Sequence, residues 1–336
     1  MMSSYRMEVS HESHAGQVRR YVQEAAHRLG ADDTRTGTAA IVATELATNL
    51  VKHGGGGEVL VREVKDSRPP ALEIHALDTG PGMSNVNACL RDGYSTAGSA
   101  GTGLGAVQRL ADQFQIHSQP GRGTVVWVRM DAGARELSQP TPLFEASGVS
   151  VAIKSEKLCG DSWDVQELPG LLRAVVVDGL GHGPFAEAAS REAVTIFRRH
   201  ERASPGDLLQ RMHEALVKTR GAAASMAEIQ HARGQMRTAG VGNVLMRLFR
   251  ANGSKTVAGD NGTLGAAVRK VQEFSHPWEE SALLVMHSDG IASQWNLDDY
   301  PGLVRRHPAL IAGIIYRDFR RGHDDATVVV IRQLTV

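Results

Sequence analysis

Near the centre of the chain stands the stretch VVVDGLGHG, residues Val175–Gly183, which decides how the second half is interpreted. Three consecutive β-branched residues are typical of a buried strand, and the glycines that follow end it. Such a strand would carry Asp178 to the edge of a sheet. A single Asp-Gly after a strand is more often ordinary turn chemistry, so a functional interpretation needs further support.

Three other aspartates provide that support, because each lies beside a predicted strand. Asp161 and Asp289 follow apolar β-type segments, and Asp324 precedes the segment at Thr327–Ile331. Several carboxylates at strand ends suit hard divalent ions, which take oxygen ligands and keep bound waters. The second half is therefore predicted to hold metal ions at one edge of a sheet.

The order of these motifs resembles the PPM family of metal-dependent serine/threonine phosphatases, in its SpoIIE/RsbX-like branch, over residues 145–336. The resemblance is carried by Gly160-Asp161-Ser162, Asp178–Gly183, Gly242-Asn243, Ser288-Asp289-Gly290 and Asp324–Val328. It implies an αββα sandwich, two Mn or Mg ions bridged by Asp178, and a phosphoserine substrate. The implied metal ligands, direct or through water, are Asp161, Asp178, the Gly179 carbonyl, Asp289 and Asp324.

The pattern departs from larger PPM enzymes at two places, and it leaves the role of Asp325 open. Those enzymes have a histidine two residues after the bridging aspartate; here His182 lies two residues further on, as a general acid or as a residue that packs the turn. Their phosphate-binding arginine has no counterpart upstream of the first aspartate, and Lys157 is either a substitute or a solvated side chain. Asp325 is either a ligand or an exposed neighbour.

The first half places polar residues on a helix and on glycine-rich turns. Glu45 and Asn49 are four residues apart on a helix predicted over 36–52, and therefore share a face. Asp78 follows a strand predicted over 71–77 and opens a turn that allows a flat ring to approach the backbone. The free amides of a helix opened by Gly101–Gly105 bind phosphate. Taken singly, these features are also explained by a solvated helix pair and an unliganded turn.

Together and in this order, the motifs resemble the GHKL ATPase family over residues 10–130, closest to the RsbT-like serine kinases of bacterial switch systems. The resemblance implies an α/β sandwich that binds ATP with Mg. It makes Glu45 the general base, Asn49 the Mg ligand and Asp78 the adenine contact, and it treats residues 92–99 as a short lid. The further nucleotide contacts are Gly80, Gly82, Met83, Gly101, Thr102, Gly103, Gly105 and Thr124. The glycine pattern is not that of a Rossmann fold or a P-loop, because no Gly-Lys-Ser/Thr follows.

The predicted organisation is two domains of mixed α/β (α+β) class, at residues 1–135 and 148–336. A polar linker with two prolines is predicted over 136–147. Further helices are expected over 14–29, 184–200, 205–218 and 300–321, and one that opens near Gly101 is expected to carry an apolar stripe as far as Phe114. Further strands are expected over 58–64, 125–130, 149–153, 225–230 and 281–287.

Composition narrows the function classes. The chain has 37 Lys+Arg and 37 Asp+Glu, and nothing in this balance suggests a nucleic-acid or membrane-surface partner, so none is expected. The apolar runs are strand-sized, so no membrane insertion is expected. Cys89 and Cys159 imply no disulfide framework. The first ten residues lack an apolar signal segment, and a cytoplasmic location is expected.

The two resemblances imply a kinase and a phosphatase that act on Ser or Thr of STAS-domain switch or stressosome-type proteins, with something that biases their ratio. Two alternatives remain for the first half. It binds ATP to shape a surface that sequesters a sigma factor or another effector without transfer, or it hydrolyses or senses ATP to regulate the phosphatase. Glu45 favours transfer, because nucleotide binding alone needs no carboxylate there.

Overall fold

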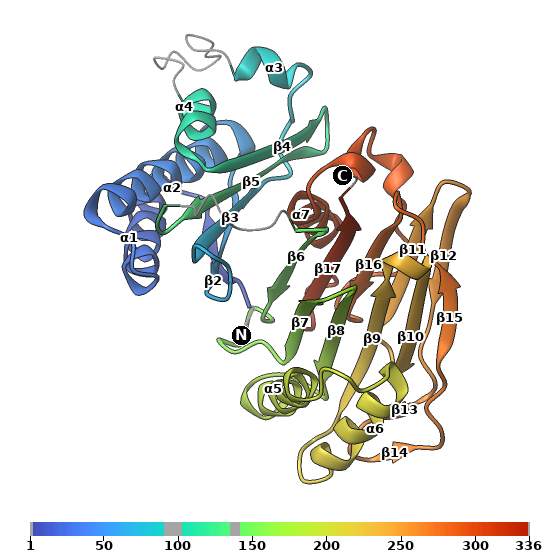
Figure 1. The fold of residues 1–336 in the computed structure, drawn as a ribbon. Coiled ribbons are helices and arrows are strands. Elements are labelled where there is room, and N and C mark those ends of the chain that lie inside the picture. The colour runs from blue at the N-terminus through green and yellow to red at the C-terminus, as the bar shows by residue number, and fades with distance from the viewer. Residues whose placement is uncertain (1–2, 91–102, 135–141, 335–336) are drawn as a thin grey trace. The chain divides into compact units, whose positions relative to one another are not determined.

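The computed structural model describes residues 3–90, 103–134 and 142–334 (Figure 1). The chain divides into two compact units, Ser4–Pro140 and Thr141–Val336. Gly101, Thr102 and the predicted lid at 92–99 lie outside the described residues.

The first unit is an antiparallel sheet in the order β1-β2-β3-β5-β4, with its long helices on one face (Figure 1). Its elements are β1 (Tyr5–Val9), α1 (Glu12–Arg28), α2 (Asp33–Gly54), β2 (Gly57–Val64), β3 (Ala71–Leu77), α3 (Val86–Cys89), α4 (Gly103–Leu110), β4 (Gln113–Gln119) and β5 (Gly123–Asp131).

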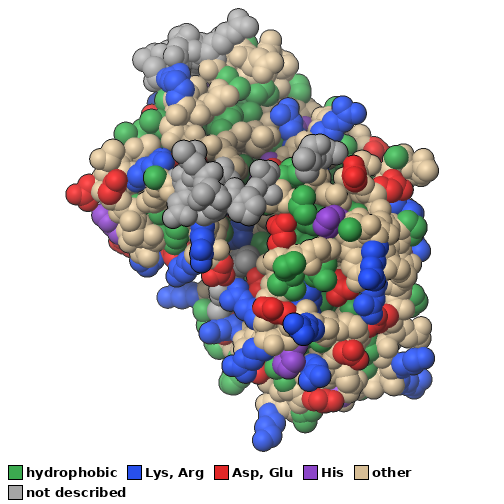
Figure 2. All heavy atoms as spheres, viewed as in Figure 1, with side chains coloured by type: hydrophobic (Ala, Val, Ile, Leu, Met, Phe, Trp, Pro, Cys, Tyr) green, Lys and Arg blue, Asp and Glu red, His purple; other side chains and the backbone are tan. Residues whose placement is uncertain are grey.

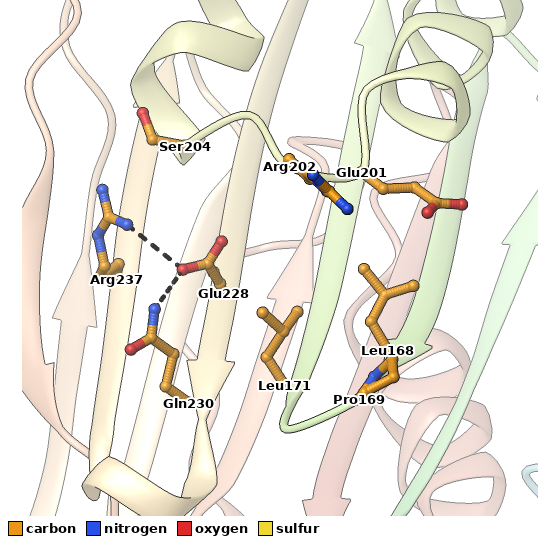
Figure 3. A pocket seen from close by; sticks show the side chains of 9 residues that line it. All are labelled: Leu168, Pro169, Leu171, Glu201, Arg202, Ser204, Glu228, Gln230 and Arg237. Carbon is orange, nitrogen blue, oxygen red and sulfur yellow. Dashed lines mark hydrogen bonds and ion pairs between the residues drawn. The ribbon is translucent and has the colours of Figure 1, made fainter.

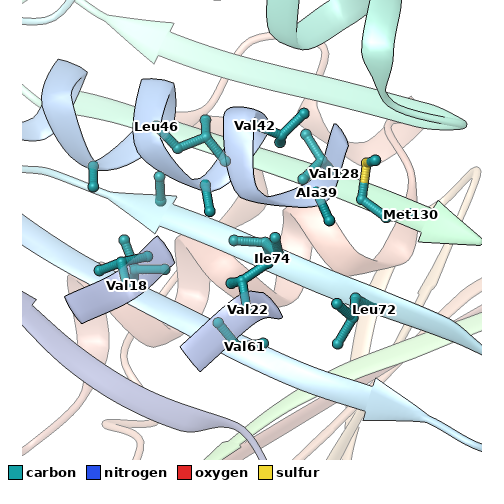
Figure 4. Close-up of a cluster of buried hydrophobic side chains, with 14 of the residues drawn as sticks. Val18, Val22, Ala39, Val42, Leu46, Val61, Leu72, Ile74, Val128 and Met130 are labelled. Carbon is teal, nitrogen blue, oxygen red and sulfur yellow. The ribbon is translucent and has the colours of Figure 1, made fainter. Parts of the chain in front are cut away.

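The core of this unit fills the space between α1, α2 and the sheet. Val18 and Val22 of α1 are fully buried, as is Val42 of α2, and they pack with Ile74 of β3 and Val128 of β5 (Figure 4). Apolar residues at helical spacing on α1 and α2 meet alternate residues of the strands, as expected for a two-layer sandwich. This packing fixes α2, the helix that carries Glu45 and Asn49.

The second unit is built from two antiparallel sheets, β15-β10-β9-β8-β7 and β12-β11-β16-β17-β6, and a short hairpin of β13 and β14. Its helices are α5 (Pro184–Arg199), α6 (Pro205–Leu216) and α7 (Pro308–Phe319), with 3-10 turns at His231–Arg233, Leu297–Asp299 and Leu303–Arg305. Its strands are β6 (Phe144–Val151), β7 (Asp161–Leu168), β8 (Leu171–Gly179), β9 (Ala222–Gln230), β10 (Gln235–Val241), β11 (Leu245–Arg250), β12 (Gly253–Val257), β13 (Gly262–Thr263), β14 (Ala267–Val268), β15 (Phe274–Pro277), β16 (Leu283–His287) and β17 (Ala326–Gln333).

The VVV run explains the layering of this unit. Val175 and Val177 pack against α5 and α6, whereas Val176 packs between the two sheets with residues such as Met286 and Val329. A strand covered on both faces has no solvent side, which is why its apolar residues are consecutive. Helix α7 packs on β6 and β17 of the other sheet. The predicted αββα sandwich is confirmed, as is the α/β class of the chain.

Several predicted boundaries were wrong. Strand β6 begins at Phe144, so four residues assigned to the linker belong to a sheet. Helix α4 ends at Leu110, and Phe114 lies in β4 rather than on a helical stripe. Of the helix expected over 300–321, the α-helical part is α7, which begins at Pro308 because proline has no amide hydrogen to lose at a first helical turn.

Acidic and basic side chains are interspersed on the face shown in Figure 2, in keeping with the zero net charge of the chain. Among the helices of the described residues, none is long and apolar enough to span a membrane.

Candidate functional sites

The first site begins on α2, where Glu45 and Asn49 are half-buried one turn apart. A β-carbon built on Gly103 would lie 3.3 Å from Glu45 Oε2 and 3.5 Å from Asn49 Oδ1. The N-terminal turn of α4 therefore faces both side chains, although more than fifty residues separate it from them in the sequence.

Asn49 provides a test of whether this place fits a nucleotide and its metal. Its Nδ2 is buried and has no hydrogen-bond partner within the described part of the chain. A buried amide without a partner costs free energy, about 1–3 kcal/mol. A ligand between α2 and the start of α4 would satisfy the Asn49 side chain, so the residues present fit the Mg and phosphates of ATP.

The second element of this site is the turn after β3. Asp78 Oδ1 accepts hydrogen bonds from the amides of Gly80 at 2.9 Å and Thr124 at 3.1 Å, and its backbone amide donates to the Thr124 carbonyl at 3.0 Å. A β-carbon on Gly123 would lie 2.2 Å from the Asp78 carbonyl oxygen, so only glycine allows this close approach. These contacts fix the Asp78 carboxylate at the end of the strand.

Ser118 is part of this turn and was missed from the sequence. Its Oγ accepts from the Met83 amide at 2.7 Å and lies 2.8 Å from Thr124 Oγ1. Ser118 thus joins two of the predicted nucleotide contacts. Of the predicted glycines, Gly80 and Gly82 lie in the same turn, and Gly105 is buried in the first turn of α4. Gly101 and Thr102 lie outside the described residues, so their role stays a prediction.

The second site lies at one edge of the sandwich. Asp161 and Asp178 are directly opposite each other on β7 and β8. Side chains so placed have β-carbons about 5 Å apart on the same face. Asp178 shares the face of Val176, which packs between the sheets. The two carboxylates therefore point to the gap between the sheets at its rim.

The other sheet brings Asp289 and Asp324 to the same rim. Asp289 follows β16 and accepts a hydrogen bond from Asn243 Nδ2, and Asp324 precedes β17. Burial raises the pKa of Asp178 to about 10, helped by the negative charges of Asp161, Asp289, Asp324 and Asp325. Burial likewise raises the pKa of Asp161 to about 7. The four predicted carboxylates are thus close enough to repel one another.

These residues fit a divalent ion held partly through water. Over residues 3–90, 103–134 and 142–334, no three His, Cys, Asp or Glu side chains converge to hold an ion by themselves. Mg²⁺ keeps several waters and commonly takes only one or two carboxylates. The Asp161–Asp178 pair is a donor set of this kind, and a cation between the two would offset the repulsion that raises their pKa values.

Ser288 positions Asp161 and was not predicted from the sequence. Its fully buried Oγ donates to Asp161 Oδ2 at 2.6 Å and accepts from the Thr327 amide at 3.0 Å. Ser288 therefore ties the Asp161 carboxylate of one sheet to a strand of the other. Outer partners of this kind hold a ligand in a fixed orientation.

Asp325 is buried, so the alternative of an exposed neighbour was wrong, and its role as an ion ligand stays a prediction. It is 2% exposed, and its two carboxylate oxygens accept from the amides of Ile153 and Gly160, both at 2.7 Å. The side chain fixes the loop that leads into Asp161. No local pattern predicts this role, because the two amides lie more than 160 residues away in the sequence.

The two uncertain basic residues lie at the surface. His182 has a half-exposed side chain and pairs with Glu156 through Nδ1, 3.0 Å from Oε1. Lys157 is exposed. Neither position contradicts a role in substrate contact, and both roles stay predictions.

A separate cavity of about 550 Å³ lies at the far ends of β7 and β8, next to the turn at Leu168–Leu171 (Figure 3). Within it, Glu228 accepts from Arg237 and Gln230, so the charges of Glu228 and Arg237 are paired with each other. Strand β8 separates this cavity from Asp178 by its whole length. The cavity is therefore not part of the carboxylate site.

Comparison with known proteins identifies both units. The family model of the histidine kinase-like ATPase domain matches residues 9–130, and that of stage II sporulation protein E (SpoIIE) matches residues 169–334. The serine/threonine-protein kinase RsbT of Bacillus subtilis strain 168 is 35% identical over 119 residues, which cover 33% of this chain and 87% of RsbT. The chain belongs to the histidine kinase-like ATPase family.

The second unit is a SpoIIE/PP2C-type domain, which this chain joins to the RsbT-type first unit. The phosphoserine phosphatase RsbX of Bacillus subtilis strain 168 is 25% identical over 139 residues, 41% of this chain and 70% of RsbX. A solved structure of RsbX with magnesium has a TM-score of 0.50 at 20% identity and covers 58% of this chain and 98% of its own; at that identity it shows the fold. A structure from work on the bacterial stressosome has a TM-score of 0.52 at 27% identity and covers 56% of this chain and 99% of its own. The predicted fusion is confirmed.

Proposed function

We propose that this protein is a bifunctional serine/threonine kinase and phosphatase of a bacterial partner-switching system, acting in both directions on STAS-domain switch proteins. The observation that supports the kinase most directly is the convergence of Glu45, Asn49 and Gly103. The proposal extends to this chain what the names of RsbT and RsbX say of those proteins.

In the first unit, different residues would serve different steps of phosphoryl transfer. This reaction is catalysed mostly by positioning and by charge neutralisation, with one residue that orients the attacking hydroxyl. Asp78 would accept a hydrogen bond from the adenine amine, and Asn49 would hold Mg, which neutralises phosphate charge when bound. Glu45 lies beside the α4 N-terminus and would take the proton from the substrate hydroxyl.

In the second unit Asp161, Asp178, the Gly179 carbonyl, Asp289 and Asp324 would hold two Mn or Mg ions. Ions held there would supply a nucleophilic water at neutral pH. The contribution of the chain is the fixed placement of the ligands: Ser288 orients Asp161, and Asn243 orients Asp289. Phosphoserine would enter at the rim where these carboxylates gather.

An intact-mass time course tests the proposal. The full chain is mixed with Mg-ATP and candidate STAS partners, as wild type, as Asp178→Asn and as Asp178→Asn with Glu45→Ala. We expect Asp178→Asn to leave a partner with one stable phosphate, which wild type with Mn then removes.

The double variant should bind ATP with unchanged affinity and leave the partner unmodified, because Glu45 acts on the hydroxyl and not on the nucleotide. A partner that gains no phosphate although ATP binds would favour the sequestering alternative for the first unit. Phosphate gain that is unaffected by Glu45→Ala would refute the role of Glu45.

A further inference from the structure

Beside the carboxylate rim lies an exposed patch whose members come from three segments. Helix α5 begins directly after the loop that follows Asp178, and it places Phe185 at the surface with 68% of its area exposed. Leu180, two residues after Asp178, is 47% exposed. Arg220 is exposed in the turn between α6 and β9. Large apolar side chains next to a catalytic edge are typical of a binding surface.

The turn that carries Arg220 is fixed to the loop that follows Asp178. Gly179 and Ala222 are opposite each other on β8 and β9, and the Leu180 amide donates to the Gly221 carbonyl at 3.0 Å. A β-carbon on Gly181 would lie 3.1 Å from Arg220 Nη1. The guanidinium therefore rests against the loop that leaves the metal-binding aspartate.

Phe185 holds the other side of this guanidinium. The Arg220 Cζ lies 5.1 Å from the centre of the Phe185 ring, within the range of a cation–π contact. Within the described part of the chain, no ion pair or hydrogen bond to a carboxylate engages Arg220. Its planar donors thus remain available to an anion, and guanidinium groups bind phosphate with two parallel hydrogen bonds.

We propose that Arg220 binds the phosphoryl group of the protein substrate, and that Phe185 and Leu180 bind an apolar side chain next to the phosphoserine. The occupant is a phosphoserine segment with apolar neighbours. This inference rests on the phosphatase function proposed above and adds to it a substrate-binding residue that lies after Asp161 in the sequence. It also explains why a large ring stays exposed at the first turn of α5.

Steady-state kinetics of the full chain with Mn test the assignment on two substrates, p-nitrophenyl phosphate and a peptide with leucine on both sides of phosphoserine. Arg220→Ala should raise KM by about tenfold for both substrates, because the phosphate loses its paired hydrogen bonds to a charged group. The KM of Arg220→Lys should lie between those of wild type and Arg220→Ala, because lysine keeps the charge but loses the paired donors. Phe185→Ala should raise KM for the peptide alone.

The matched control is Arg202→Ala, an exposed arginine that lines the cavity at the far ends of the strands (Figure 3). It should leave both KM values unchanged. Equal KM values for wild type and Arg220→Ala on both substrates would overturn the assignment. If Phe185→Ala raises KM equally for both substrates, the proposed apolar subsite is wrong.

A binding measurement separates this inference from the proposed activity. The fluorescein-labelled phosphoserine peptide and its unphosphorylated form are titrated with Asp178→Asn, alone and combined with Arg220→Ala, and followed by anisotropy. We expect preference for the phosphorylated peptide, lost with Arg220→Ala. If Arg220 gives this preference but the wild-type chain does not hydrolyse the phosphorylated peptide, the proposed phosphatase activity is refuted and the binding subsite is retained. Equal affinity for the phosphorylated and unphosphorylated peptides would refute the subsite, and so would an affinity that Arg220→Ala leaves unchanged.

Discussion

At the scale of single residues, the phosphatase unit depends on side chains that touch no substrate. Asp325 supplies both acceptors for the amides of Ile153 and Gly160. In Asp325→Asn one of these acceptors becomes an NH₂ group, so one amide loses its partner. The free energy of unfolding should fall by about 1–3 kcal/mol, and phosphatase kcat should fall as the loop before Asp161 shifts.

Urea unfolding and phosphatase assays measure these effects, with Asp299→Asn as the control because Asp299 is exposed. Phosphoryl transfer by the first unit should not change. Equal stability of the two variants would show that Asp325 does not hold the loop.

The carboxylate rim also predicts how stability depends on pH when the metal is removed. Burial and neighbouring charges raise the pKa of Asp161 to about 7 and that of Asp178 to about 10, from ordinary values near 4. A carboxyl whose pKa is higher in the folded state stabilises the fold below its unfolded pKa, and this contribution disappears as pH rises through the folded pKa.

In EDTA, the melting temperature of the second unit should therefore fall as pH rises from about 4 through 7 and beyond. Saturating Mg²⁺ should reduce the fall, because the ion offsets the charges. Calorimetry of the full chain measures both, and Asp178→Asn should flatten the EDTA curve. A metal-free melting temperature that rises over this range would contradict the electrostatic account.

At the scale of elements, Gly37 and Gly179 should respond in opposite ways to the same substitution by alanine. Gly37 lies inside α2, and a β-carbon there would meet nothing within 4 Å. Gly37→Ala should raise the free energy of unfolding of the first unit by about 0.5–1 kcal/mol, because alanine loses less chain entropy in a helix.

In Gly179→Ala, the new methyl would lie 2.1 Å from the Ala186 carbonyl oxygen at the start of α5. The helix would have to move, so stability and phosphatase activity should both fall. Thermal melts of the two variants measure the contrast, and a destabilising Gly37→Ala would show that α2 does not tolerate a side chain at that face.

Elements with a clear local period were predictable, and those that depend on pairing were not. Strand β3 was predicted with its observed bounds, and α1, α2, α5 and α6 within a few residues, because their apolar spacing is decisive. Edge strands such as β1 and β12 carry polar residues and exist through their partners. Phe114 was misplaced because no glycine or proline marks the break after Leu110.

Site residues, too, were predictable from local motifs and not from contacts between distant segments. Motif residues such as Asp78 and Asp178 can be predicted because glycines follow them at the end of a strand. Arg220, Ser288 and Asp325 contribute through distant segments brought together by the fold, and no pattern of one sequence reveals that proximity.

At the scale of the whole molecule, the central claim is that one chain adds and removes phosphate on the same partner. Two such activities together consume ATP continuously as long as the partner is present. Silencing either site should break this cycle in a distinct way, because Glu45 and Asp178 belong to different units.

The measurement that tests this most directly is the release of inorganic phosphate over time by the full chain with Mg-ATP, Mn and a small amount of STAS partner. We predict continuous release by wild type, far beyond one phosphate per partner, and none without partner. Asp178→Asn should convert about one ATP per partner to phosphorylated partner and then stop, and Glu45→Ala should release none. Continuous release by Asp178→Asn, or by wild type alone, would contradict the account and identify the first unit as an ATP hydrolase.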